Sequence, residues 1–264
     1  MSTEASESTF NIPARVGGSM TGSEFGASIF NVPSGEAREL AILQQLELGN
    51  IPNFMRQSRL IEVANAEHTA IFEVLPDVLC IGTDEDFLRV PMNPVTAQKF
   101  LDLIGGTLPT AFLNDEIWKQ ADVKLEPVTM PPTKEMTSTE WFIGHNGKVE
   151  LLRKRRPGLV GGHKKAVVLT NNLLLAGFKN CVAIQGWHYL SGKAIQGLNP
   201  SQGVHHTHVW TYVDYSHGIF ALSQKVLLDD ECVDFEVVAA GKDTASLVNG
   251  AAGQLRFLRY ATAA

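Results

Sequence analysis

The sequence predicts an α+β fold, with helices and a short sheet in the N-terminal half followed by a β-rich, mostly antiparallel C-terminal half. Helical spacing of apolar residues is concentrated in the first half, whereas short apolar runs bounded by turn residues dominate the second half. Strands and helices do not alternate as they do in parallel βαβ proteins. With 264 residues, 44% of them hydrophobic, the chain can bury a core without disulfides or a structural metal.

Residues 1–34 are expected to form a flexible, poorly packed arm, because they are rich in serine, threonine and glycine. Two similar segments, Ser8–Pro13 and Ser28–Pro33, each place apolar residues before a proline. These segments could dock on the body of the protein or on a neighbouring subunit, which would give a homo-oligomer. Residues 35–264 are expected to form a single globular domain, with a subdivision near 126–137 left open.

A first helix is expected after Ser34, where apolar residues recur at helical spacing until Gly49-Asn50 ends the pattern. The next apolar runs predict three strands, at Arg59–Ala64, Thr69–Leu75 and Val78–Ile81. The acidic segment Thr83–Asp86 lacks the ligand spacing and the glycine of a calcium loop, so we interpret it as a solvated turn.

Residues 94–104 form the clearest predicted helix, with Asn93 as N-cap, proline at the first position and Gly105-Gly106 as the stop. A second helix should follow Thr110 and end near Ala121. This helix–GGTLPT–helix piece resembles the corresponding segment of sulfatase-modifying, C-type-lectin-like proteins. The arginine that this family carries before Leu-Pro-Thr and its acidic run afterwards are missing or altered here. The function of that family is therefore not carried over.

A proline-rich connector over residues 126–137 leads into the β-rich half. The strands expected there are Ala166–Thr170, Cys181–Tyr189, Thr207–Tyr215, Ile219–Leu222, Phe235–Ala239 and Leu255–Tyr260. The sequence contains no Walker loop, Rossmann fingerprint, HExxH or GxSxG motif.

The net charge of −6 argues against general nucleic-acid binding. Between Lys148 and Lys165, however, seven cationic residues stand against the single acid Glu150, so this basic island carries +6. It either attracts an anionic ligand or forms a solvated surface segment. The acidic N-terminus and the short apolar runs predict a cytoplasmic protein without a membrane partner, while export by a route without a classical signal stays open. The three separated cysteines are expected to be buried free thiols.

Seven of the eight histidines lie between residues 145 and 217, and histidine titrates near neutral pH and binds metals. The first candidate piece is Gly161–Lys165, whose glycines allow close backbone approach and whose Lys164 can hold an anion. The alternative interpretation of this piece is a surface turn with solvated lysines. The second is Gly186-Trp187-His188 at the end of a predicted strand. It suits either a binding cleft or the edge of a core.

The third piece runs from His205 to Gly218. If Thr207–Asp214 is a strand, its alternation places one set of side chains on a single face: His206, His208, Trp210, Tyr212 and Asp214. The spacing of His206 and His208 is that by which one strand presents two imidazoles to a metal, as in cupin-like sites. A divalent transition metal would need a third ligand from elsewhere, such as His188 or His217.

The segment Asp214–Gly218 also permits acid–base chemistry, because a carboxylate can orient an imidazole that removes a proton. Adjacent Ser216 and His217 point apart in a strand, so a serine–histidine pair would use His188 or His163. Ser216-His217 with Trp187-His188 resembles elements of D-alanyl-D-alanine-type zinc peptidases. The order is reversed and the second-ligand aspartate is missing here, so this assignment is not made.

From about residue 36 to the end, the chain resembles uncharacterised bacterial proteins through Gly161–Lys165, Gly186–His188 and Tyr212–Gly218. The resemblance implies no activity. From the residues we predict a hydrolase or lyase that acts on a small-molecule, glycan or peptide substrate of anionic or glycan-like character. The expected catalytic residues are His163, His188, His208, Asp214, Ser216 and His217. The expected substrate-binding residues are Lys164, Trp187 and Tyr215.

Three alternatives remain at this point. The same cleft could belong to a non-catalytic module that binds a carbohydrate or an acidic ligand, with Trp187 and Trp210 exposed. The protein could instead be an assembly protein that works through residues 1–34, or a metal-dependent oxygenase. The hydrolase or lyase prediction requires that two or more of the candidate imidazoles meet in one cavity.

Overall fold

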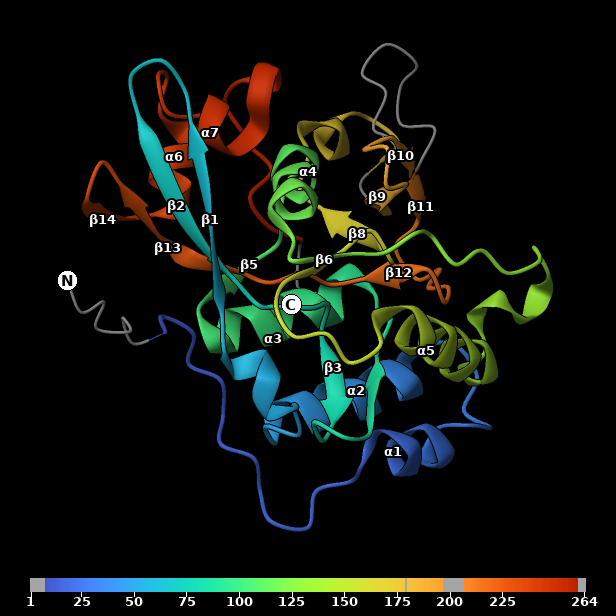
Figure 1. Ribbon diagram of the computed structural model, residues 1–264. Coiled ribbons are helices and arrows are strands. Elements are labelled where there is room, and N and C mark those ends of the chain that lie inside the picture. The colour runs from blue at the N-terminus through green and yellow to red at the C-terminus, as the bar shows by residue number, and fades with distance from the viewer. Residues whose placement is uncertain (1–7, 179, 197–206, 261–264) are drawn as a thin grey trace.

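The computed structural model describes residues 8–178, 180–196 and 207–260, which form an α+β fold as the sequence predicts (Figure 1). Helices dominate the N-terminal half, and sheets rich in antiparallel pairs dominate the C-terminal half. The α-helices are α1 (Gly22–Ser28), α2 (Glu36–Glu47), α3 (Pro94–Ile104), α4 (Ala111–Gln120), α5 (Thr139–Arg153), α6 (Phe235–Ala240) and α7 (Ser246–Asn249). No helix in these described ranges is long and apolar enough to cross a membrane.

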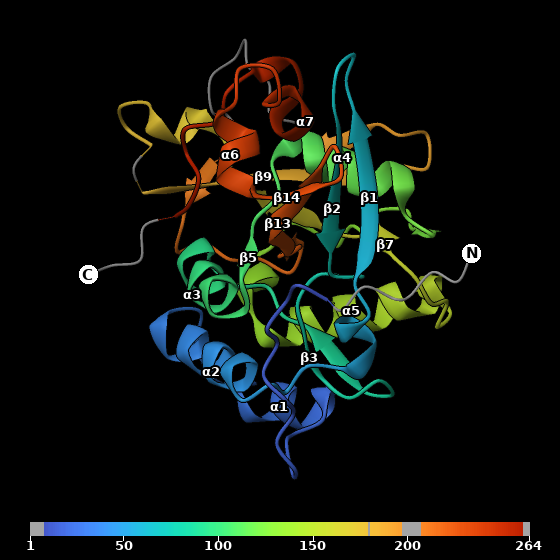
Figure 2. The ribbon, with the colours of Figure 1, turned by 90° about the vertical axis from the view of Figure 1, so that its left-hand side faces the viewer.

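Two larger sheets organise the chain. The first has the order β1-β2-β13-β14, with β5 also paired to β13, and all its neighbours are antiparallel (Figure 2). Its strands are β1 (Arg59–Ala64), β2 (Thr69–Val74), β5 (Gly106–Thr107), β13 (Leu222–Leu228) and β14 (Glu231–Asp234). This sheet therefore pairs strands of the N-terminal half with strands of the C-terminal half.

The second sheet has the order β10-β9-β8-β12, with β11 paired to β9. Its strands are β8 (Lys165–Val168), β9 (Cys181–His188), β10 (Ala194–Gln196), β11 (Thr207–Val209) and β12 (His217–Gly218). The pairs are antiparallel except that β12 runs parallel to β8. Two smaller pairs complete the strands, namely β3 (Cys80–Gly82) with β4 (Phe87–Arg89), and β6 (Val123–Lys124) with β7 (Val160–Gly161).

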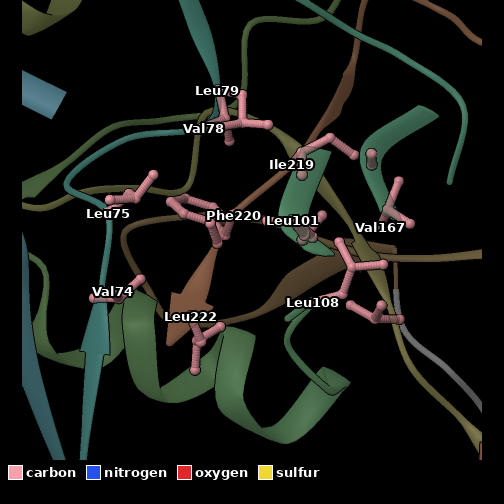
Figure 3. Close-up of a cluster of buried hydrophobic side chains, with 14 of the residues drawn as sticks. Val74, Leu75, Val78, Leu79, Leu101, Leu108, Val167, Ile219, Phe220 and Leu222 are labelled. Atoms are coloured by element: carbon pink, nitrogen blue, oxygen red, sulfur yellow. The ribbon is translucent and has the colours of Figure 1, made fainter. Parts of the chain in front are cut away.

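The main core combines buried residues of both sheets with residues of α2, α3 and β3, and Figure 3 shows part of it. The short segment after β12 passes through this core before it becomes β13. Backbone hydrogen bonds secure it, because Leu79 N donates to Ile219 O at 2.9 Å and Leu75 N donates to Ala221 O at 3.0 Å. Phe220 on this segment is buried. The core therefore sets the position of β12 and of His217 at its start.

Local signals placed α3 and α4 correctly. The Asn93 side chain accepts a hydrogen bond from Thr96 N, and Gly105 adopts a left-handed φ of 71° at the C-terminus of α3. Thr110 caps α4 in the same way by accepting from Leu113 N. Ser34 does not cap α2, because Gly35 occupies the N-cap position and the Ser34 hydroxyl instead accepts from Arg38.

The predicted secondary structure was wrong at several places in the C-terminal half. Residues 139–153 form the 15-residue helix α5, although no helix was expected there. Phe235–Ala239 lies in α6 instead of a strand, because Phe235, Val238 and Ala239 bury one helical face. The predicted strand Thr207–Tyr215 ends at Val209, and residues 255–260 form no strand. Of the cysteines, all free, Cys80 is buried but Cys232 is exposed.

Residues 8–34 pack against the body, contrary to the expectation of a poorly packed arm. Phe10, Phe25 and Ile29 all join the main core, and their burial stabilises the docked segment. The two similar segments are not equivalent, since Phe10 is buried whereas Phe30 is 48% exposed. Docking on the body accounts for the first segment, and a role of this region in oligomerisation stays a prediction.

Candidate functional site

A tight turn before β12 brings three of the predicted catalytic residues together. Asp214 Oδ1 accepts hydrogen bonds from the backbone N of Ser216 at 2.7 Å and from its Oγ at 2.5 Å. The backbone N of His217 donates to Asp214 O at 3.1 Å, and Ser216 O accepts from Lys165 N at 2.8 Å. These bonds join the turn to β8 and hold the Asp214 carboxylate in one orientation.

The imidazole of His217 faces this carboxylate. His217 is 1% exposed, and its Nε2 lies 3.7 Å from Asp214 Oδ2. Among the described residues, Nε2 has no hydrogen-bond partner. The rings of His208 and Tyr212 lie nearby, with centroids 6.1 and 6.3 Å from that of His217. His208 is exposed, whereas Asp214 and His217 are both buried.

Burial lowers the pKa of His217 to about 4, although the Asp214 charge opposes that shift. Burial would raise the pKa of Asp214, but His217, the hydrogen bonds from Ser216 and the charge of Lys165 together lower it. Near neutral pH the pair is therefore a neutral imidazole beside an ionised carboxylate. This is the protonation state that a histidine general base needs, with a carboxylate as its partner.

The lowered pKa of His217 makes a prediction for stability. Between the unfolded pKa of 6.5 and the folded value of about 4, the unfolded chain binds a proton that the native imidazole does not. The free energy of unfolding should therefore fall as pH falls through this window, with a contribution from His217 on the order of 3 kcal/mol. Urea unfolding at a series of pH values should show a shallower slope for His217→Gln than for the natural protein.

The control for this measurement is His68→Gln. The hydrogen bond to Asp229 raises the pKa of the partly exposed His68, so its contribution has the opposite sign and is lost as pH rises. His68→Gln should therefore not flatten the acid slope. An unchanged slope in His217→Gln would show that the His217 imidazole is not held neutral by the fold.

Lys164 lies next to this turn and is buried. Its Nζ donates a hydrogen bond to the backbone oxygen of Tyr215. Burial and the nearby Arg89 charge lower the pKa of Lys164 to about 7, against the opposing charge of Asp214. The Lys165 ammonium lies on the Trp187 ring, with its Nζ 4.6 Å from the ring centre, and its charge lowers the pKa of both Asp214 and His217. The predicted anion-binding lysine is thus an internal group, and Lys165 is the more accessible of the two.

The backbone at Trp187 is strained. Gly186 has a φ of 121° and Trp187 a φ of 60°, a conformation that a bulky residue rarely adopts. Two hydrogen bonds hold Trp187 in this conformation. Its backbone N donates to Lys164 O at 3.1 Å, and its Nε1 donates to His163 O at 3.1 Å. Strain of this kind clusters at functional sites. It marks the region where β8, β9 and β12 meet.

Trp187 and Tyr215, the predicted stacking residues, are both buried and pack on each other, with ring centroids 6.2 Å apart. The Tyr215 hydroxyl accepts from Met130 N at 2.8 Å, and its ring contacts Trp141 and His145 of α5. The structure therefore gives both rings internal partners instead of an open face for substrate.

His163 points away from the turn into a buried ionic network. Its Nε2 lies 2.9 Å from Asp77 Oδ1, and Asp77 also accepts from Arg89 Nη2 at 2.7 Å. Arg89 Nη2 donates further to Glu150 at 2.7 Å, and Arg153 Nη1 lies 3.8 Å from Asp77. Asp77, Arg89 and His163 are essentially inaccessible. The coulombic attraction of Arg89 and His163 keeps the pKa of Asp77 low despite burial.

His145 was not predicted as a site residue, yet it lies beside Tyr215 and is fully buried. Neither ring nitrogen has a well-formed hydrogen bond within the described part of the chain, although the backbone at Val128 lies close enough to favour the protonated ring. Burial and the positive charges of Lys164, His163 and Arg89 lower its pKa far below the ordinary histidine value. A buried imidazole without a well-formed hydrogen bond costs stability. Sequence reasoning did not find His145, because helix α5 was not predicted and the burial of His145 on it could not be foreseen.

His188 belongs to a third carboxylate–imidazole pair, on the side of α4. Its Nε2 lies 2.6 Å from Asp115 Oδ1, and Gln185 Nε2 donates to the same oxygen at 2.7 Å. The His188 ring stacks on Trp118, with centroids 5.3 Å apart. Asp115 and Trp118 were not predicted, because nothing in their local sequence links them to His188.

Comparisons of the chain with protein-family models, with curated proteins and with solved structures found no match. The geometry of the Asp214–His217 pair is therefore the basis for a functional proposal.

The structure brings together Asp214, Ser216, His217 and His208, with Lys164 adjacent. It does not bring His163 or His188 into the same group, since their rings pair with Asp77 and Asp115. The convergence of imidazoles that the hydrolase or lyase prediction requires is thus limited to His208 and His217, and neither lines any of the cavities described below. Within the described ranges, no three His, Cys, Asp or Glu side chains are arranged to hold a metal ion. His206, one of the two predicted metal ligands, lies outside those residues.

Proposed function

We propose that the protein is a hydrolase or lyase in which His217 acts as general base and Asp214 stabilises the imidazolium that forms. The observation that carries the proposal is the buried Nε2 of His217, unpaired among the described residues, 3.7 Å from an oriented carboxylate. A neutral imidazole at neutral pH can accept a proton from water, from a hydroxyl or from a carbon acid. The adjacent negative charge favours that transfer.

Ser216 acts in this proposal as a positioning residue. Its hydroxyl has one proton, which it donates to Asp214, so it is not poised to attack a substrate. In a hydrolytic reaction His217 would instead activate water. In a lyase reaction it would remove a proton next to a carbonyl or carboxylate, and the leaving group would depart from the neighbouring carbon.

An anionic or glycan-like substrate is favoured by the charge around the pair. Lys165 pairs in register with His217 across β8 and β12 and is only partly buried. A partly exposed ammonium next to a general base can hold a carboxylate, phosphate or sulfate group of a substrate. We assign this role to Lys165, because Lys164 is bound internally to Tyr215.

The proposal is tested with a substrate panel. We expect turnover of at least one class among nitrophenyl esters, phosphates, sulfates and glycosides, or formation of new carbon–carbon double bonds from acidic polysaccharides. His217→Gln should lower that turnover by about 10²- to 10⁴-fold, because the base is lost, whereas His68→Gln, which changes a partly exposed imidazole in a separate pair, should retain it. Turnover that is unchanged in His217→Gln, or an entire panel without turnover, would contradict the proposal.

A second candidate is a non-catalytic binding module for a carbohydrate or an acidic ligand. It is favoured by a pocket of about 480 Å³ that Trp210 lines together with Glu39, Asn93 and Lys99. An aromatic ring beside carboxylate, amide and amine groups suits recognition of a hydroxylated ligand. Trp187 does not support this candidate, since it is buried. A non-catalytic module of this kind would turn over none of the substrates in the panel.

A further inference from the structure

A second cavity of about 480 Å³ lies away from the Asp214–His217 pair, between the β3–β4 turn, the start of β1 and the C-terminal end of α5. Its lining includes Phe54, Arg59, Phe87, Glu150, Arg153 and Arg155. Three arginines thus face one hollow, and two of them belong to the basic island of the sequence. The volume lies within the range of small-molecule sites.

Arg153 is held rigidly at this cavity. Its guanidinium carbon lies 4.8 Å from the centre of the Phe54 ring and 5.6 Å from that of Phe87, and the side chain is 7% exposed. Its Nε donates to Arg156 O at 3.2 Å, and its Nη1 lies 3.6 Å from Glu150. Within the described residues Nη2 makes no hydrogen bond. A guanidinium fixed in this way loses little freedom when it binds an anion.

The backbone turns sharply directly after Arg153, and this turn sets the neighbouring side chains apart. Lys154 and Arg155 both adopt left-handed φ values, 53° and 54°. As a result Arg155 lines the cavity whereas Lys154 does not. Arg155 is exposed and makes no ion pair among the described residues. It is therefore available to a ligand.

The acidic residues at the cavity are mostly engaged within the protein. Asp84 accepts from Phe54 N at 3.0 Å, Asp86 accepts from Ser23, and Glu150 is bound by Arg89. These bonds leave Glu85 as the acid with no such partner in the described chain. The unengaged donors, in contrast, are cationic. The bonds to Asp84 and Asp86 come from neutral donors, so the four carboxylates of the lining keep their charge and outnumber its three arginines. An anion is therefore held here by direct contact with the guanidinium groups of Arg153 and Arg155, and not by the net charge of the lining.

We propose that this cavity is a binding site for a small ligand that carries a phosphate or carboxylate group, held by Arg153 and Arg155. Arginine suits both groups, because its planar fork of donors matches two oxygens of either anion. The rings of Phe54 and Phe87 offer an apolar wall to the body of the ligand. The site is separate from the proposed catalytic pair, so it does not depend on the proposed function.

The test is calorimetric titration of the full chain with inorganic phosphate and, separately, with succinate. We expect saturable binding of at least one probe at one site per chain. Arg155→Gln should weaken this binding by about 10-fold, as expected for loss of one charged hydrogen-bond donor. Lys154→Gln is the matched control, because it removes the same charge from the neighbouring position outside the cavity and should change the dissociation constant by less than about 2-fold.

Binding of phosphate alone or of succinate alone would each support the site and define which anion it takes. Two results would overturn the proposal. One is the absence of saturable binding for both probes. The other is equal weakening by Arg155→Gln and Lys154→Gln, which would indicate diffuse attraction to the basic island. Arg59→Gln provides a second variant at the cavity wall, and its partly exposed side chain makes misfolding a minor concern.

Discussion

Asp214→Asn is expected to lower kcat/KM for the substrate found by the panel by about 10²- to 10⁴-fold, the range that general acid–base catalysis contributes. Asparagine keeps the shape of the side chain and can still accept a hydrogen bond from Ser216. It cannot supply the negative charge that stabilises protonated His217 from 3.7 Å. The measurement is steady-state kinetics across pH on variants with natural circular dichroism.

Because Asp214 and His217 act on one proton, their effects should not add. The double variant Asp214→Asn with His217→Gln should be no slower than His217→Gln alone. Asp115→Asn offers a matched control, since it removes the carboxylate of the separate His188 pair. Multiplicative losses in the double variant would mean that the two residues serve different steps, and the assigned pairing would be wrong.

Asp77→Asn is expected to lower the free energy of unfolding by about 3–5 kcal/mol, the usual cost of removing one partner from a buried ion pair. Asp77 is fully buried and is held by both Arg89 and His163. Without its charge, the Arg89 guanidinium stays buried with Glu150 as its remaining close carboxylate. Urea unfolding followed by circular dichroism would measure the loss.

Asp234→Asn is the control for this variant. It removes one partner of an exposed ion pair with Lys225, and such pairs contribute at most about 1 kcal/mol. If Asp77→Asn were no more destabilising than Asp234→Asn, the buried network would carry little of the stability of the fold. His163 would then need another explanation for its burial.

Helix α3 could be predicted residue by residue because its signals are local. Asn93, Pro94 and Gly105 specify a start and a stop through bonds within one turn. Helix α5 was missed for the opposite reason. It contains Gly144 and Gly147, which weaken helix propensity, and its stability comes from burying Phe142, His145 and Val149 against the rest of the protein.

The candidate site likewise combines contacts between sequence neighbours, which could be predicted, with contacts between distant residues, which could not. Asp214, Ser216 and His217 are neighbours along the chain, so their proximity could be expected from the sequence alone. The partners of His163 and His188 could not, because Asp77 and Asp115 lie 86 and 73 residues away from them. Two predicted catalytic histidines thus proved to belong to other pairs. The same holds for Arg153 and Phe54, which meet only through the fold.

The sequence by itself determined the α+β class, the capped helices α3 and α4, the strands of the first sheet's opening hairpin and the closeness of Asp214, Ser216 and His217 along the chain. Each follows from residues close along the chain, whose dihedral preferences, caps and alternation act locally. Only the tertiary structure decided which carboxylate faces each imidazole, that residues 8–34 are docked, and that Trp187 and Tyr215 are buried. Those outcomes depend on burial and charge pairing between distant segments, and such interactions leave no periodic pattern in the sequence.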